Sequence, residues 1–139
     1  ISPPFLTQAT IFEFLERGGF EPNLVRVREG LRARRDAMLD ALEAVSPAGF
    51  TWNRPEGGYF LWLELPEAVE VVELLRAAER LGVTFVPGPD FFPRGGGGRS
   101  AARLAFSFAS PSQLGEAVSR LANALPSASA VDLGQQHAA

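Results

Sequence analysis

The stretch RSAARLAFSFASP, residues 99–111, decides the fold because it leads from a strand pattern directly into a helix start. Apolar residues occupy every second position, which predicts a β-strand with one face toward the core; these residues are Leu104, Phe106 and Phe108. The opposite face carries Arg103 between small residues. Arg103 is therefore either a solvent-exposed charge or a cation that receives an anion.

A helix is predicted to begin immediately after this strand. Ser110 is a good N-cap, Pro111 suits the first helical position, and Gln113 stands where a capping box needs Glu or Gln. Apolar residues then recur at spacings of four and three, at Leu114, Val118, Leu121 and Leu125. Beyond them the periodicity stops, and we expect residues 126–139 to form a disordered tail.

Two strands joined by a tight turn are predicted upstream, over 50–54 and 58–65. The segment 58–65, GYFLWLEL, is apolar at both odd and even positions, which predicts a strand covered on both faces. A helix over 67–81, a short strand over 83–86 and a loop over 87–98 lead back to the opening stretch.

Helical periodicity dominates the N-terminal third, with helices predicted over 5–17 and 22–45. The whole order predicts an α+β protein: a small α/β sandwich whose short, mostly antiparallel sheet is covered by helices and preceded by a long linking helix. We expect residues 1–46 to link to a large domain upstream, and 47–125 to form the small C-terminal domain.

The composition excludes several kinds of binding site and catalytic group. The 139 residues are 46% hydrophobic with a formal net charge of −3, which suits one compact core and not a polyanion-binding protein. There is no cysteine, and the one histidine is His137, so we expect no metal site. All 13 basic residues are arginine, so none of these residues can form a lysine Schiff base.

The sequence shows no long apolar run and no signal-peptide pattern, so we expect a cytoplasmic protein without a membrane span. It begins at Ile1 rather than at a methionine, from which we expect the chain to be part of a longer protein.

Two further patterns are interpreted as structural. The run GGGGRS at 95–100 lacks the lysine of a phosphate loop and precedes a strand rather than a helix, so it is predicted to be a loop. A cluster of arginines with interleaved acidic residues predicts a solvated helix face, with pairs such as Arg32 and Asp36 one turn apart. The arginines are Arg26, Arg28, Arg32, Arg34 and Arg35.

Aromatic residues in the predicted strands and the following loop are expected to lie in the core; they are Phe60, Trp62, Phe85, Phe91 and Phe92. The pair Phe91-Phe92 is the exception to follow, because it lies in a Gly/Pro loop where apolar side chains need a partner.

Arg103 is the candidate binding residue. Its planar guanidinium matches a carboxylate with two parallel hydrogen bonds, and a strand would hold it rigidly. Ala105 and Ser107 are small and would leave room for a ligand beside it.

Four stretches together resemble the C-terminal part of fold-type-I, pyridoxal-phosphate-dependent aminotransferases of class I/II. The branch they resemble contains 2-aminoadipate-type aminotransferases and the aminotransferase-like half of MocR-type regulators. The stretches appear in the family's order and spacing, and they are FLERGGFEPNLVRVREGLRARRDAMLDAL (14–42), PEGGYFLWLELPE (55–67), GVTFVPGPDFF (82–92) and ARLAFSFASPSQLGEAVSRL (102–121). Asn23 departs from the histidine often found there in the family.

The resemblance implies that the complete protein is a homodimeric enzyme that uses pyridoxal 5'-phosphate to transfer an amino group between an amino acid and a 2-oxo acid. It implies that Arg103 binds the α-carboxylate of the substrate. The Schiff-base lysine and the cofactor contacts belong to the upstream large domain, so we expect no catalytic or cofactor-binding residue among these 139 and no activity from them alone.

Two alternatives stay open. The same module occurs as the effector-sensing half of GntR/MocR-type transcription regulators, where a separate domain binds DNA. A free-standing binding domain for amino acids or 2-oxo acids is the other. In each case this part of the protein is expected to bind neither nucleic acid nor membrane, and its sequence does not predict which amino acid is bound.

Overall fold

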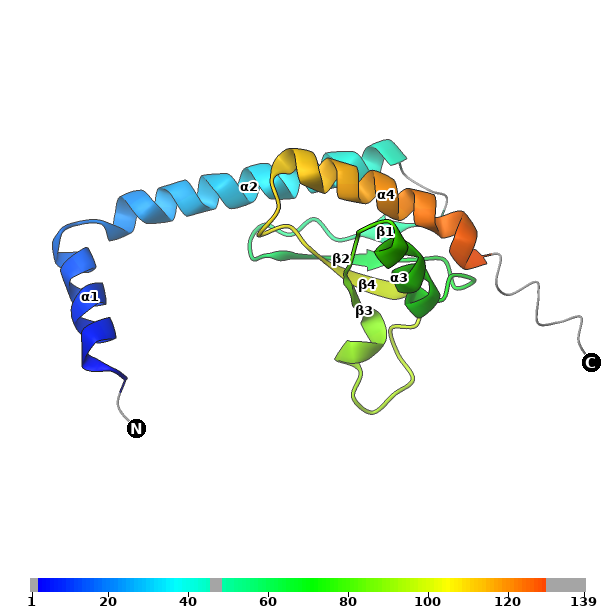
Figure 1. The fold of residues 1–139 in the computed structure, drawn as a ribbon, viewed down its shortest axis with the longest axis horizontal. Helices are drawn as coiled ribbons and strands as arrows, with labels where there is room; N and C mark the ends of the chain where they lie inside the picture. Colours follow the sequence, from blue (N-terminus) through cyan, green and yellow to red (C-terminus); the bar gives the residue numbers. More distant parts are fainter. Residues whose placement is uncertain (1–2, 46–48, 130–139) are drawn as a thin grey trace, which may run out of the picture.

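The computed structural model describes residues 3–45 and 49–129, with side chains to residue 125 (Figure 1). Apart from one short 3-10 helix, its elements follow one another in the order that the sequence predicts. In chain order they are α1 (Phe5–Glu16), α2 (Phe20–Val45), β1 (Thr51–Trp52), β2 (Phe60–Glu64), α3 (Val71–Arg80), β3 (Val86–Pro87), the 3-10 helix η1 (Gly88–Phe91), β4 (Ala101–Ala105) and α4 (Pro111–Ser129).

The four strands form one antiparallel sheet in the order β1-β2-β4-β3. β4 therefore lies inside the sheet, between β2 and β3. Arg103 pairs with Trp62 of β2 on one side and with Val86 of β3 on the other. The expected α+β class with a short antiparallel sheet is confirmed.

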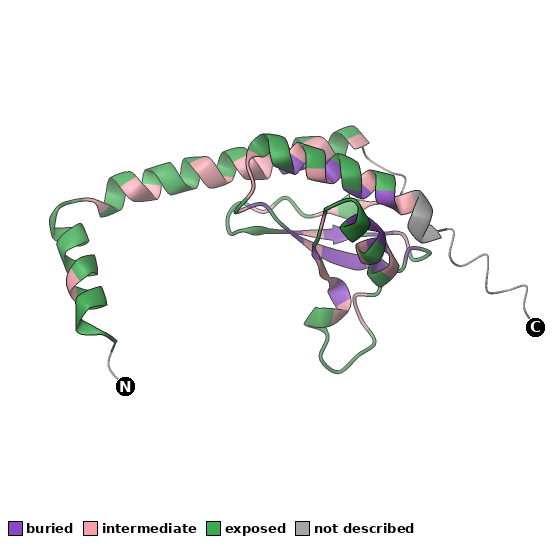
Figure 2. Ribbon diagram, viewed as in Figure 1, coloured by how far each residue is buried: buried purple, intermediate pink, exposed green. Residues whose placement is uncertain are grey.

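One face of the sheet carries the core, and α2, α3 and α4 pack on it (Figures 1 and 2). Strand residues at alternate positions point into this core: Leu61 and Leu63 from β2, Ala102 and Leu104 from β4. No helix among the described residues covers the opposite face in the same way. On that face Phe60 is exposed and Trp62 is half-buried. The prediction that segment 58–65 is covered on both faces is therefore wrong for the residues that the structure describes.

The boundaries differ from the predicted ones where proline and glycine interrupt the pattern. α3 begins at Val71, after a turn at 67–68 and a bend at Val69, and β3 is confined to Val86–Pro87 instead of 83–86. The predicted loop 87–98 contains the short helix η1. Phe108 lies beyond the end of β4 and is 94% exposed, so it does not continue the core face of that strand.

The capping box of α4 is confirmed. The Gln113 backbone N–H donates to the Ser110 hydroxyl oxygen at 3.3 Å, and the Ser110 backbone N–H donates to Gln113 Oε1 at 2.9 Å. These two bonds satisfy donors that a helix start otherwise leaves unpaired. α4 runs to Ser129, four residues past the predicted end, and residues 130–139 of the predicted tail lie outside the described residues.

α1 stands apart from the sheet, and none of its residues is buried (Figure 2). Gly18 follows it with a φ of 68°, a conformation that favours glycine, and the chain turns there into α2. Only the C-terminal half of α2 enters the core, through Met38, Leu39 and Leu42. Within the described part of the chain, no helix is long and apolar enough to cross a membrane.

Replacing Ser110 with Ala should lower the free energy of unfolding by about 1 kcal/mol, because the Gln113 N–H loses its acceptor. Urea denaturation followed by circular dichroism would measure the change. Ser119→Ala is the matched control, since that exposed hydroxyl only donates to the Gly115 carbonyl one turn earlier in the same helix. Equal stability of the two variants would contradict a capping role for Ser110.

Candidate functional site

Arg103 lies at the centre of the sheet, on the face away from the three helices. Its strand is hydrogen-bonded on both edges, which fixes the direction of its side chain. The neighbours across the two ladders are Trp62 and Val86. The site is thus built on one of the two inner strands of the sheet.

Two phenylalanine rings lie against the guanidinium. Its Cζ atom is 4.0 Å from the ring centroid of Phe60 and 4.8 Å from that of Phe91. Trp62 contacts Phe91 edge-on, with centroids 5.4 Å apart and planes at 78°. Such cation–π contacts contribute about 0.5–2 kcal/mol each. The rings contact the cation but offer no oxygen or nitrogen acceptor for its N–H groups.

The donors of Arg103 have no acceptor in the part of the chain that the structure describes. Its Nε is buried without a hydrogen-bond partner, and no carboxylate of residues 3–45 or 49–129 pairs with its guanidinium. Other arginines do form ion pairs: Arg17, Arg35, Arg54, Arg76, Arg99 and Arg120. A buried unpaired donor costs about 1–3 kcal/mol, so this arrangement calls for an acceptor.

The two small residues predicted beside Arg103 lie in different places, and only Ala105 stays in its strand. Ala105 ends β4, pairs with Phe60 across the ladder and is exposed. Ser107 lies beyond the strand and instead lines a cleft with Gly30 and Arg34 of α2. Ser107 therefore contributes to another surface.

The prediction that the aromatic residues are core is correct for Phe85, which is buried, and wrong for Phe60, which is 42% exposed. The Phe91-Phe92 pair, set apart in the sequence as an exception, is 40% and 43% exposed. Sequence analysis missed the rings of Phe60 and Phe91 as partners of Arg103. A signal was present for Phe60, because the strand alternation places it opposite the core residues Leu61 and Leu63. Nothing in the sequence pairs Phe91 with Arg103, since that contact depends on how η1 folds back.

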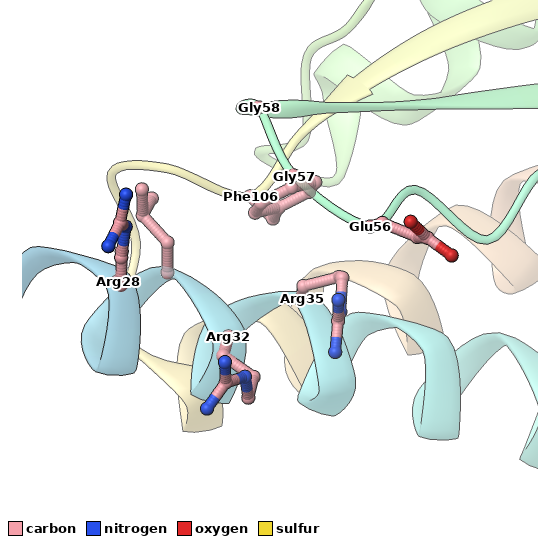
Figure 3. A pocket seen from close by; sticks show the side chains of 8 residues that line it. Arg28, Arg32, Arg35, Glu56, Gly57, Gly58 and Phe106 are labelled. Atoms are coloured by element: carbon pink, nitrogen blue, oxygen red, sulfur yellow. The ribbon is translucent and has the colours of Figure 1, made fainter.

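The arginine cluster lies elsewhere, on α2 (Figure 3). A cleft of about 480 Å³ runs between Arg28, Arg32 and Arg35 of that helix and the turn at 56–58, with Phe106 on its lining. The predicted Arg32–Asp36 pair is not observed, because Asp36 pairs with Arg35 at 2.6 Å. Arg35 also donates to the Pro55 carbonyl at 3.2 Å, so it ties α2 to the loop before β2 and is not simply solvated.

Two other predictions can be compared with the structure. The glycine run is an irregular loop followed by β4, as predicted. Within the residues that the structure describes, no group of three or more histidine, cysteine or acidic side chains is arranged to hold a metal ion.

The fold and the position of Arg103 define a small α+β domain with one open sheet face. The sequence model of the family described as aspartate amino-transferase matches residues 1–137. The chain belongs to this family of fold-type-I aminotransferases and corresponds to their C-terminal domain. The resemblance stated from the four sequence stretches is confirmed.

Individual relatives agree with this assignment. The chain is 39% identical over 122 residues to a 2-aminoadipate transaminase of Thermus thermophilus, covering 88% of this chain and 30% of the relative. The crystal structure of LysN, an α-aminoadipate aminotransferase of the same species complexed with N-(5'-phosphopyridoxyl)-L-leucine, matches with a TM-score of 0.83 at 38% identity, covering 92% of this chain and 32% of that one. The chain thus spans about a third of the length of these relatives.

A regulator is also similar. The HTH-type transcriptional regulator TauR of Rhodobacter capsulatus is 31% identical over 128 residues, which cover 88% of this chain and 25% of the regulator. The alternative drawn from the sequence is consistent with this finding, while the more similar relatives are aminotransferases.

Replacing Arg103 with Met should change the free energy of unfolding by no more than about 1 kcal/mol. The lost cation–π contacts are offset by removal of the unpaired buried Nε, and the apolar stem still packs on both rings. Chemical denaturation would measure the difference. A loss of 3 kcal/mol or more would show that Arg103 serves the fold itself.

Proposed function

We propose that this chain provides the site that binds the substrate α-carboxylate in a pyridoxal-phosphate-dependent aminotransferase. One observation carries the proposal. The Arg103 guanidinium lies against two phenylalanine rings, and its hydrogen-bond donors have no partner within the described residues. An amino acid and a 2-oxo acid share the carboxylate that such a fork would bind.

The chemistry of Arg103 is binding and orientation. Two parallel N–H···O bonds to a carboxylate fix the position and also the rotation of the ligand, which a point charge such as lysine would not do. The strand and the rings hold the guanidinium in place before the ligand arrives, so little further ordering is needed on binding. Arg103 would thereby set the direction in which the Cα–H bond of the substrate points.

The cofactor is not held by any lysine of these 139 residues, because they contain none. Pyridoxal phosphate supplies the electron sink that lets an amino acid lose its Cα proton. We propose that the Schiff-base lysine and most cofactor contacts lie in an upstream large domain of the complete protein, which would act as a homodimer. On this proposal residues 47–125 form the small domain, and residues 1–46 link it to the large one.

The regulator is the second candidate, supported by the similarity to TauR. In that case Arg103 would bind the carboxylate of an effector, and a DNA-binding domain would lie elsewhere in the protein. The proposed role of Arg103 is the same in both cases, and only the use of the bound ligand differs.

Arg103→Ala in the full-length protein should weaken amino-acid binding about 100- to 1,000-fold and leave cofactor affinity nearly unchanged, because a bidentate charged contact is lost. The KM of the amino acid and a cofactor titration would measure the two effects. Arg76→Ala is the control, since Arg76 pairs with Glu73 on the exposed side of α3.

An unchanged KM in the Arg103 variant would contradict the proposed site. A full-length protein that binds the amino acid but forms no 2-oxo acid would favour the regulator over the enzyme.

A further inference from the structure

The segment that carries Phe91 is closed by two glycines at its ends. Gly88 begins η1 and Gly98 ends the loop, and their backbones touch. A Cβ on Gly98 would lie 2.5 Å from the Gly88 carbonyl carbon, and a Cβ on Gly88 would collide with the Gly98 carbonyl oxygen. Only two residues without side chains can approach this closely, so the contact fixes where the loop starts and ends.

Hydrogen bonds hold both ends of the closed loop. The Ala101 N–H donates to the Gly98 carbonyl at 3.1 Å, at the start of β4. The Phe92 N–H donates to the Pro89 carbonyl at 3.0 Å and so closes the turn of η1. Phe91 therefore projects from a short helix that is attached to the same strand as Arg103.

We infer that Phe91 is a positioning residue for the carboxylate site: held by the Gly88–Gly98 contact, it restricts the motion of the Arg103 guanidinium. The inference rests on the proposed function of Arg103 and adds the element that orders it. Phe60 and Phe91 reach the guanidinium from different elements, β2 and η1, and their centroids lie 4.0 and 4.8 Å from its Cζ.

The contact of Phe91 with Trp62 explains why a ring is needed at this position. Trp62 lies on β2, directly across the ladder from Arg103. Its ring makes an edge-on contact with the ring of Phe91, so both aromatic residues lie beside Arg103. Phe91 is thus supported on the far side by a second aromatic residue. Leucine would keep an apolar contact there but has no planar face for the guanidinium.

The effect of Phe91 on carboxylate affinity comes from holding the Arg103 side chain in place and not from the energy of the cation–π contact. The rings contact the guanidinium with and without a bound carboxylate, so most of that energy cancels in the binding equilibrium. What changes is the cost of immobilising a long side chain when the ligand binds, about 0.5–1.5 kcal/mol. Loss of Phe91 should therefore weaken binding by about 2- to 12-fold, far less than loss of Arg103.

The test uses propionate, whose short chain limits contact with Phe91 itself, and the full-length protein. Its dissociation constant would be measured by ligand-observed NMR, together with the order parameter of the Arg103 Nε–H bond. Phe91→Leu should lower the order parameter and weaken propionate binding by about 2- to 12-fold. Phe91→Tyr should keep the order parameter and the affinity of the unmodified protein, because it retains the ring. Phe108→Leu is the control at an exposed ring.

The glycine contact is tested in the same assay. Gly98→Ala should reproduce the effect of Phe91→Leu, because the new Cβ pushes Gly88 and η1 away. Gly96→Ala is the matched control: Gly96 also has a positive φ, 81°, but a Cβ there meets nothing within 4 Å. Equal effects of the two substitutions would mean that backbone strain, and not the contact, is responsible, and would overturn this part of the inference.

The outcomes separate the two claims. If Arg103→Ala leaves propionate affinity unchanged, the proposed function is wrong. If Arg103→Ala weakens binding but Phe91→Leu changes neither the affinity nor the order parameter, the proposed function stands and the positioning role of Phe91 is wrong. A loss of affinity in Phe91→Tyr equal to that in Phe91→Leu would also overturn that role.

Discussion

The hydrogen bonding of β4 on both of its edges is the constraint on which the rest of the structure depends. Because β2 and β3 hold this strand, alternate residues must point to opposite faces, with Leu104 in the core and Arg103 on the open face. A shift of one residue would place the charge among the three helices and the leucine in solvent. The free energy of core packing therefore also fixes the place of the cation.

On the proposed function, the open face keeps the Arg103 guanidinium available for a ligand and loses some stability because its Nε is unpaired. An internal carboxylate beside Arg103 would satisfy its donors, but any ligand would then have to displace that group. The two phenylalanine rings stabilise the cation and no acceptor among the described residues pairs with its N–H groups, so a carboxylate bound there, as proposed, would have no competitor in that part of the chain. The unpaired Nε is the cost of this arrangement, of the kind that functional sites often carry.

Local signals predict much of the fold, and long-range contacts account for what was missed. The capping box at Ser110 and the alternation around Leu104 depend only on neighbours in sequence, and both are correct. The strand predicted over 83–86 lies at Val86–Pro87, and η1 was not predicted, because the glycines of the following loop allow several backbone paths and the Gly88–Gly98 approach selects one of them. The sequence singles out Arg103 as a candidate, but the contact of Phe91 with it joins residues twelve positions apart through a folded loop.

The length of α2 has a mechanical consequence. At 26 residues the helix is about 39 Å long, and it packs against the core from Leu31 onward. A continuous helix is stiff, so the free N-terminal part acts as a lever: a tilt of a few degrees at Met38 becomes a displacement of an ångström or more at Phe20. Whatever is attached to the N-terminal end of α2 would therefore move in step with the sheet that carries Arg103.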